Sequence, residues 1–475
     1  GSSGVRTGGG EVMSVDRTEL PPIGPDPLFT FPRPVKHTLA NGLTIWAVEH
    51  GAMPVVSACL LLHCGSASDP ENHGGLGSLT AALLDEGSGS RSALEVQEAL
   101  RQIGARFNRH VTADATQLRM TSLSRFTGQA LTLLAELGTC PTFDEEQFTR
   151  VKQLRLDQLV QSRDVPSANA NRIMVEALYG DHPYGHNPSG TEASIQTLTR
   201  DHVVDFHREF YQPAKATLIL VGAMPAEQLL DQAATAFQRW CATPETRTAD
   251  LDTRCEAHSE GTQRERLIVM NRPGAAQSEL RIGHRGVSRD TPDYHALRVL
   301  NMILGGQFVS RLNLNLREDK GYTYGVSTGF TFCRYAGDFM AALSVQTNAT
   351  SESIREVLKE IGHIRDSKPV SADELVQAKA ALTRGYPLGF ETASQVVQGF
   401  ANSALYQLPD DYFTQVVPSV NLVDLETVRR VAQEYLVPDQ LTTVVVGDRD
   451  AIATGLTDLH AGELIEIKHE DLISN

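Results

Sequence analysis

Two histidines stand four positions apart in the segment HPYGH, and such a pair on one helix face could hold a metal ion. They are His182 and His186. Pro183 and Gly185 lie between them, however, and proline with glycine predicts a loop in place of a helix. We therefore expect these histidines to be ordinary loop residues.

A second group of metal-binding residue types consists of His63, Cys64 and His73. Their positions are those of a strand end and the turn that follows it. No carboxylate stands at ligand spacing from them, so strand and turn residues account for all three. We expect no metal ion here either.

Composition limits the partners of this chain. Its 475 residues are 41% hydrophobic and 21% charged, which suits a globular protein of two to four domains. Lys and Arg number 42 and Asp and Glu 58, a formal charge of −16 that repels nucleic acid and anionic lipid. A basic or neutral peptide is the more natural partner.

The six cysteines show neither a pairing pattern nor a doubled C-x-x-C, which argues against a disulfide framework and a zinc ribbon. No run approaches the roughly 18 apolar residues of a membrane span. The start, GSSGVRTGGGEVM, has no apolar signal core, and we expect residues 1–20 to be disordered or tag-like. None of these features establishes the compartment.

Each half of the sequence closes with a similar phrase, which indicates an internal duplication. The phrases are PAKATLILVGAM, from Pro213, and PDQLTTVVVGDR, from Pro438. The proline precedes a glycine by nine positions in both (222 − 213 and 447 − 438), and the apolar residues between them favour a buried strand. The openings TIWAVEHGAMPVVSACLLLHCGS and RLIVMNRPGAAQSELRIGHRGVS both predict strand, turn and strand.

These patterns predict two related modules, residues 21–241 and 265–475, joined by a polar, turn-rich linker at 242–264. Within them we expect long helices at 92–103, 144–162 and 350–366. Early strands, then helices, then a closing strand favour an α+β fold in which each module is a mostly antiparallel sheet covered by helices.

Seven segments in consecutive order resemble the inverzincin metallopeptidases of pitrilysin and insulinase type, and more narrowly their processing-peptidase-like branch. The resemblance covers about residues 34 to 450 and consists of NGLTIWAVE, GSASDPENHGGLG, LYGDHPYGHNPSGT, FYQPAKATLILVG, NRPGAAQSELRIG, NMILGGQFVSRLNLNLREDKGYTYGV and VPDQLTTVVVGD. It implies two α+β modules that form half of a clamshell.

In active relatives the helix after the glycine that matches Gly75 carries H-x-x-E-H, two zinc ligands and a general base. Here that helix reads GLGSLTAALLDEG, and Ser78, Ala81 and Ala82 occupy the histidine, glutamate and histidine positions. A further glutamate ligand of the family aligns with Gln158. Because none of these side chains suits zinc, we expect this chain to bind none.

In the second half, LREDKGYTYGV matches the family's arginine/tyrosine element, with Arg317 seven positions before Tyr324. The resemblance implies that this pair contacts the substrate carbonyl. Taken alone, a helix charge and a strand aromatic are both common. Tyr322 has the wrong spacing, although on a regular strand it would face the same side as Tyr324 and could support it. Gly305 and Gly306 could let substrate approach the backbone, or could form a plain turn.

Three functions follow from the resemblance. The favoured one is a zinc-free subunit, inactive alone, that supplies Arg317 and Tyr324 in trans to a zinc-bearing homologue in a heterodimer that cuts peptides. The alternatives are a structural core-like subunit with no peptidase role and a homodimer that only binds peptides. Bacterial relatives of this type are often exported, which slightly favours a periplasmic over a cytoplasmic location.

Overall fold

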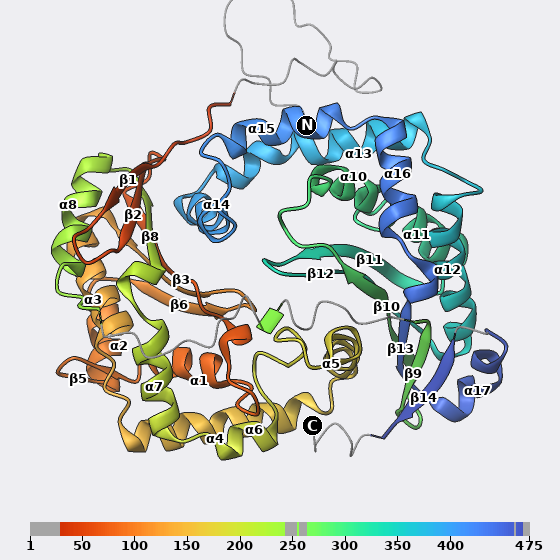
Figure 1. Ribbon diagram of the computed structural model, residues 1–475, viewed down its shortest axis with the longest axis horizontal. Helices are drawn as coiled ribbons and strands as arrows, with labels where there is room; N and C mark the ends of the chain where they lie inside the picture. Colours follow the sequence, from red (N-terminus) through yellow and green to blue (C-terminus); the bar gives the residue numbers. More distant parts are fainter. Residues whose placement is uncertain (1–28, 243–253, 256–263, 460–461, 469–475) are drawn as a thin grey trace, which may run out of the picture. The chain divides into compact units, whose positions relative to one another are not determined.

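Two six-stranded sheets form the frame of this protein (Figure 1). The computed structural model describes residues 29–242, 254–255, 264–459 and 462–468. Residues 31–475 cluster into one compact unit. The predicted disordered start, 1–20, and most of the predicted linker, 242–264, lie outside the described residues.

The first sheet has the strand order β1-β2-β8-β3-β7-β6, and its strands pair antiparallel except for β2 with β8. A separate small hairpin pairs β4 (Gly87–Ser88) with β5 (Arg91–Ser92). The sheet strands are β1 (Val35–Thr38), β2 (Thr44–Glu49), β3 (Val55–Leu62), β6 (Arg106–Val111), β7 (Thr116–Leu123) and β8 (Ala216–Gly222).

The second sheet has the order β11-β12-β10-β13-β9-β14. Five neighbouring strands of it repeat the order of the first sheet: β2, β8, β3, β7 and β6 there correspond to β9, β13, β10, β12 and β11 here. The parallel pair is also repeated, since β13 pairs parallel with β9 as β8 does with β2. Shared topology is what a duplicated module would give. The strands are β9 (Arg266–Asn271), β10 (Gln277–Gly286), β11 (Thr323–Phe332), β12 (Gly337–Gln346), β13 (Thr442–Gly447) and β14 (Glu463–Ile467).

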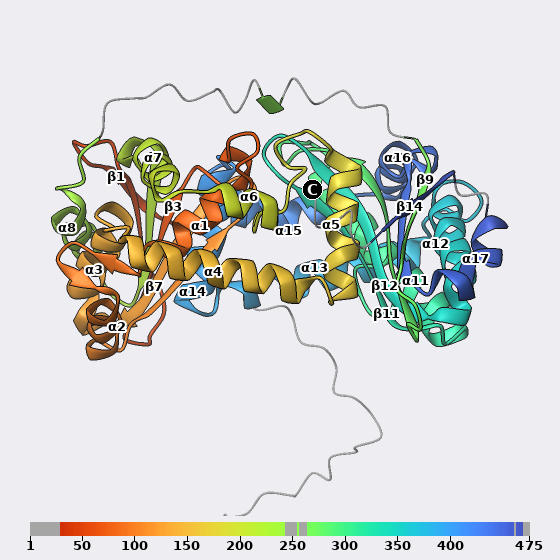
Figure 2. The same cartoon turned by 90° about the horizontal axis from the view of Figure 1, so that it is seen from below.

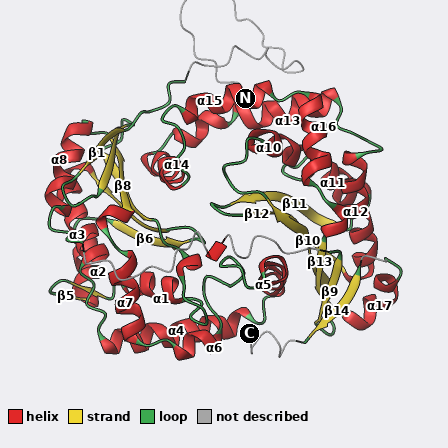
Figure 3. Ribbon diagram, viewed as in Figure 1, coloured by secondary structure: helices red, strands yellow, loops and turns green. Residues whose placement is uncertain are grey.

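Helices surround both sheets, so the predicted α+β class is confirmed (Figure 3). In the first half they are α1 (Leu76–Leu83), α2 (Ala93–Gln102), α3 (Thr127–Thr139), α4 (Glu145–Ser162), α5 (Pro166–Tyr179), α6 (Glu192–Thr197), α7 (Arg200–Phe210) and α8 (Ala226–Phe237). In the second half they are α10 (Tyr294–Leu304), α11 (Arg311–Asn313), α12 (Thr350–Arg365), α13 (Ala372–Arg384), α14 (Ala393–Leu405), α15 (Tyr412–Leu422), α16 (Leu425–Tyr435) and α17 (Arg449–Thr457).

The helices α2, α4 and α12 match the predicted ranges to within one residue at each end. Their capping explains why: the Ser92 hydroxyl and the Asp144 carboxylate accept hydrogen bonds from the first free N–H groups of α2 and α4. None of the helices in the described ranges is long and apolar enough to cross a membrane.

Each sheet is covered on one face by helices of its own half and on the other by a helix from the opposite half. Helix α14 packs on β3 and β8 of the first sheet. There the rings of Phe400 and Trp46 pack edge to face, with their centroids 6.2 Å apart. Helix α5 packs on β10 and β13 of the second sheet, where Ile173 joins a buried cluster with Val444 (Figures 1 and 2). The two halves therefore complete each other's cores.

Buried polar contacts also join the halves. The Tyr184 hydroxyl donates to the Asp114 carboxylate, which also accepts from the backbone N–H of Arg334 at 2.8 Å. The Tyr179 hydroxyl donates to Asp338 at 3.0 Å. Burial raises the pKa of both aspartates, and their hydrogen bonds partly offset that effect.

Candidate functional site

Gly75 is the N-cap residue just before helix α1, and its φ of 93° is in the left-handed region that favours glycine. A Cβ there would also lie 2.9 Å from the backbone of Gly190, so no other residue fits. The buried Asp69 carboxylate accepts from the N–H groups of Gly75 and Gly77, each at 2.7 Å. An anion at a helix N-terminus is favourable, and it fixes the direction of α1.

Helix α1 carries the three residues that the sequence analysis predicts to stand at the family's metal-site positions. Ala81 is buried, and Ser78 and Ala82 are partly exposed. The Ser78 hydroxyl already accepts a hydrogen bond from Nη1 of Arg155, on α4, at 2.9 Å. The same Arg155 nitrogen lies 3.4 Å from the carbonyl oxygen of Ser189.

These groups do not fit zinc. A structural or catalytic zinc site needs three or four nitrogen, sulfur or oxygen ligands, and two of the positions hold methyl groups. A guanidinium lies against the third, and arginine stays protonated at physiological pH and repels a divalent cation. Burial, and then the charge of Arg109, lower the pKa of Arg155, which shows that this side chain lies in a partly desolvated, positive environment.

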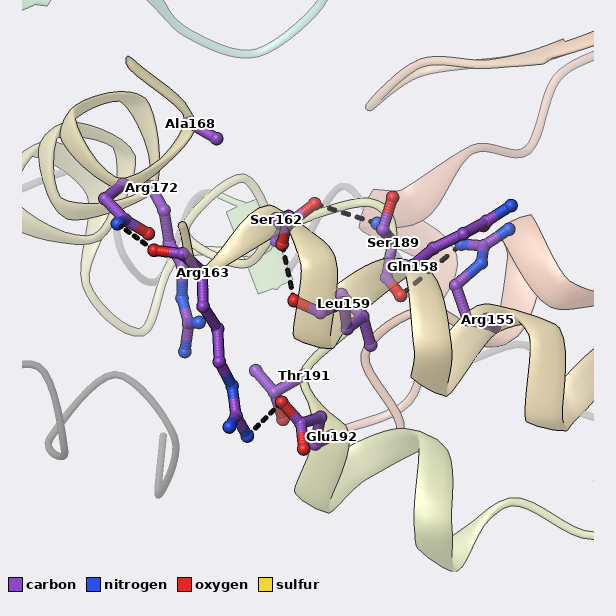
Figure 4. Close-up of a pocket in the computed structure, with 12 residues that line it drawn as sticks. Arg155, Gln158, Leu159, Ser162, Arg163, Ala168, Arg172, Ser189, Thr191 and Glu192 are labelled. Carbon is purple, nitrogen blue, oxygen red and sulfur yellow. Dashed lines mark hydrogen bonds and ion pairs between the residues drawn. The ribbon is translucent and has the colours of Figure 1, made fainter. Parts of the chain in front are cut away.

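Gln158, the fourth predicted position, lies on α4 one turn after Arg155 and is exposed. Both residues line a cavity of about 280 Å³ between α4, α5 and the segment 187–192 (Figure 4). Sequence reasoning missed Arg155, although its place three residues before Gln158 on the same helix face was a usable signal.

Three of the histidines form hydrogen bonds within the protein. The buried His182 accepts from the backbone N–H of Tyr184 at 3.0 Å through Nδ1, and Nε2 of His186 lies 3.1 Å from the Asp69 carboxylate. Nδ1 of His73 lies 3.0 Å from the carbonyl oxygen of Glu71. Across the described ranges, no three His, Cys, Asp or Glu side chains are grouped so that they could hold a metal ion.

Tyr324, in β11, projects from a bulge and is 92% exposed. The pairing of β11 with β12 is irregular between Thr323 and Val326. The Thr323 hydroxyl stabilises this irregularity, because it donates to the carbonyl oxygen of Ser344 at 2.7 Å and accepts from the N–H of Gly325 at 3.1 Å. Bulges of this kind redirect a side chain away from the regular face of a strand.

Arg317 lies in the π-helical turn η4 (Leu314–Asp319), which packs against β11. Its guanidinium is 4.0 Å from the ring centroid of Phe308, and its Nε is 3.5 Å from the Glu318 carboxylate. Phe308 is itself 59% exposed, so the arginine lies over an accessible aromatic ring. π-helical turns are rare and occur often at functional sites.

The buried amide of Asn313 ties the turn that carries Arg317 to the strand that carries Tyr324. Its Oδ1 accepts from the N–H of Val326 at 2.9 Å, and its Nδ2 donates to the carbonyl oxygen of the same residue at 2.8 Å. Sequence reasoning did not single out Asn313. No hydrogen bond or ion pair joins Arg317 directly to Tyr324 in the part of the chain that the structure describes.

Gly305 and Gly306 lie where α10 ends. A Cβ on Gly305 would come within 2.5 Å of the Thr328 side chain, and one on Gly306 within 2.6 Å of Asn301. Both glycines thus allow close approach of the chain to itself. A role for them in substrate binding stays a prediction.

The fold defines a class: an α+β protein of two halves, each built on a six-stranded sheet, in which five strands of the second sheet repeat the order of the first. Residues 46–192 match the model of the insulinase family, peptidase family M16, and residues 197–382 match that of the peptidase M16 inactive domain. The chain belongs to peptidase family M16, and the match to the domain type described as inactive extends from the end of the first half into the second.

Relatives and solved structures agree with this assignment. The uncharacterized zinc protease YmxG of Bacillus subtilis is 23% identical over 416 residues, which is 86% of this chain and 97% of that protein. The non-peptidase homolog YmxG of Helicobacter pylori is 23% identical over 84% of this chain and 91% of its own length. A peptidase M16 inactive domain structure from Pseudomonas fluorescens superposes with a TM-score of 0.80 at 25% identity, covering 87% of this chain and 97% of that one.

Proposed function

We propose that this chain is the non-metal subunit of a heterodimeric zinc peptidase. In this proposal it presents Arg317 and Tyr324 to a peptide held at the metal site of a homologous, zinc-bearing partner. The observation that supports the proposal most is the exposure of Tyr324 on a bulge of β11. The Asn313 side chain fixes the end of this bulge, because it hydrogen-bonds both the N–H and the carbonyl oxygen of Val326. A tyrosine whose role was to pack against the core would be buried, whereas the side chain of Tyr324 is 92% exposed.

The chemistry expected of the pair is carbonyl activation. A phenol hydroxyl held at a fixed place can donate to the oxyanion that develops when water attacks a peptide carbonyl. The guanidinium supplies several donors and a permanent positive charge for the same carbonyl or its neighbour. Neither group can activate water, so the zinc and the general base must come from the partner.

The first half also supports a model in which the zinc comes from the partner. Ser78 is hydrogen-bonded to a cationic side chain, Arg155, at the place where active relatives carry a metal ligand. The acidic balance of the chain, −16, suits basic or neutral peptide substrates.

The test is a peptidase assay with a quenched fluorescent peptide. The chain alone, its purified zinc-bearing homologue alone, and the mixture are measured with and without a chelator. We expect chelator-sensitive activity that rises only in the mixture. Tyr324→Phe should lower kcat of the mixture by about 10²- to 10³-fold, the usual cost of one lost oxyanion donor.

Tyr322→Phe is the matched control. It also removes one phenol hydroxyl, only two residues from Tyr324, but the Tyr322 side chain packs against the core. It should leave the rate of the mixture unchanged. Full activity of Tyr324→Phe would refute the assigned role. No gain on mixing would instead favour a structural subunit, in line with the description of the Helicobacter pylori relative as a non-peptidase homolog.

A further inference from the structure

Phe308 is a large apolar residue that stands in the short segment between α10 and α11. Its side chain is 59% exposed. Single exposed apolar residues are common on protein surfaces, so the exposure alone says little. What sets Phe308 apart is its contact: the guanidinium carbon of Arg317 lies over its ring, 4.0 Å from the centroid.

Hydrogen bonds fix the backbone on both sides of Phe308. The N–H of Ser310 donates to the carbonyl oxygen of Gln307 at 3.1 Å. The amide nitrogen of Asn313 lies within hydrogen-bonding distance of the same carbonyl oxygen and of the Ser310 hydroxyl, each at 3.1 Å. The same amide also binds Val326 of β11. The segment with the ring is thus held in place relative to the strand that carries the exposed tyrosine.

The ring can hold the Arg317 guanidinium without occupying its N–H groups. An aromatic face attracts a cation through its quadrupole, whereas a carboxylate does so by accepting hydrogen bonds. Within the described ranges no protein group accepts a hydrogen bond from this guanidinium, and its nearest approach to the Glu318 carboxylate is an ion pair at 3.5 Å. The donors therefore stay available for a peptide carbonyl.

Of these two contacts of Arg317, the ring is the one that strengthens when a peptide binds. The Glu318 side chain is 51% exposed, and exposed ion pairs contribute little because water and salt screen them. A cation–π contact becomes stronger as water leaves it. A peptide bound over Arg317 would remove that water.

We propose that Phe308 is a positioning residue, whose ring holds the Arg317 guanidinium in place to meet the peptide carbonyl beside Tyr324. Phe308 acts through Arg317 and does not itself contact the carbonyl. This inference rests on the proposed function and adds to it the group that orients one member of the pair.

The experiment measures kcat and KM of the mixture of this chain with its zinc-bearing homologue. Phe308→Leu keeps an apolar side chain but removes the aromatic face. It should lower kcat by about 2- to 30-fold, the range that a cation–π contact covers from an exposed to a desolvated setting. KM should change by less than about twofold, because the lost interaction acts in the transition state. Phe308→Tyr keeps an aromatic face and should retain the original kcat.

Two controls and one double variant separate positioning from other roles of this segment. Val309→Ala shortens the neighbouring apolar side chain, which is 52% exposed and has no aromatic face, and it should leave kcat unchanged. Glu318→Gln removes the ion pair and should change kcat by less than about twofold. In a chain that already carries Arg317→Ala, Phe308→Leu should have no further effect, because the ring acts through the arginine.

Acrylamide quenching of tryptophan fluorescence tests the contact in the chain alone. Phe308→Trp places an indole at the same position, and the native Trp46 and Trp240 are buried, so they contribute little to the quenching. Adding Arg317→Ala should uncover one face of the new indole and raise its quenching constant. Adding Glu318→Gln should leave that constant unchanged.

Three results would overturn the inference. The first is an unaltered kcat in Phe308→Leu when Arg317→Ala lowers it, which would leave the proposed function standing. The second is an equal loss in Phe308→Leu and Val309→Ala, or a loss that a higher concentration of this chain restores; either would make the segment a docking surface for the partner. The third is quenching that Arg317→Ala does not alter. If the mixture shows no activity that depends on Arg317, the proposed function and this inference fail together.

Discussion

Replacing Asn313 by alanine tests how the turn that carries Arg317 is fixed to the strand that carries Tyr324. The Asn313 side chain makes four contacts shorter than 3.2 Å: two with the backbone of Val326, one with the Ser310 hydroxyl and one with the carbonyl oxygen of Gln307. Because the amide group has only two hydrogens for its three acceptors, these contacts amount to roughly three full hydrogen bonds.

A net hydrogen bond contributes about 1 kcal/mol, and a buried backbone group left without a partner adds a further penalty. Alanine gains up to about 0.7 kcal/mol from its higher helix propensity, which offsets part of the loss. We therefore expect Asn313→Ala to lower the free energy of unfolding by about 2 to 4 kcal/mol. The amide of Val326 should also exchange its hydrogen faster, since its acceptor is gone.

Urea denaturation followed by circular dichroism measures the first quantity, and hydrogen exchange read by mass spectrometry measures the second. Asn402→Ala is the control, because Asn402 is an exposed residue of α14 whose side chain accepts a hydrogen bond from Gln398 at 3.1 Å, one turn away on the same helix. It should change stability by less than about 0.7 kcal/mol. If Asn313→Ala lowered the free energy of unfolding by less than about 1 kcal/mol and left hydrogen exchange at Val326 unaltered, the hydrogen bonds of Asn313 would not be what holds the bulge in place.

Two further predictions concern titrating groups. Burial raises the pKa of the Cys64 thiol to about 12, so Cys64 should resist alkylation at pH 8 until the chain unfolds, whereas the exposed Cys140 should react at once; peptide mapping by mass spectrometry distinguishes them. Burial alone would raise the pKa of Glu374, but hydrogen bonds from Arg311 and from Ser371 outweigh it and hold that pKa at about 2, below the ordinary 4.5. The stability that Glu374 contributes is thus complete above pH 4.5 and is lost as the pH falls toward 2, so the difference in stability between the unaltered chain and Glu374→Gln should shrink over that window.

The sequence carried most of the information on the elements. The apolar phrases after Pro213 and Pro438 became β8 and β13, and Ser92 and Asp144 marked the starts of two helices because a side-chain cap is a local interaction. A duplicated topology also follows from repeated phrases. These signals need no knowledge of distant contacts.

The parts that sequence reasoning missed depend on contacts between distant segments. Spacing could show that Ser78 is not a histidine, but not that Arg155, on another helix, donates to it. Tyr322 was expected to share a strand face with Tyr324. Instead Tyr322 lies just before β11 and packs against the core of the second half, whereas Tyr324 lies within the bulge of β11 and is exposed.

The exchange of α5 and α14 between the halves has a consequence for synthesis on the ribosome. The first sheet is complete once Gly222 of β8 has emerged, but its second face stays bare until α14 ends at Leu405. At ~5 to 20 residues per second, that interval lasts roughly 10 to 40 s. During it the apolar surface around Trp46 and Leu61 lacks the helix that packs on it in the finished protein, so the nascent first half is a natural client for a chaperone.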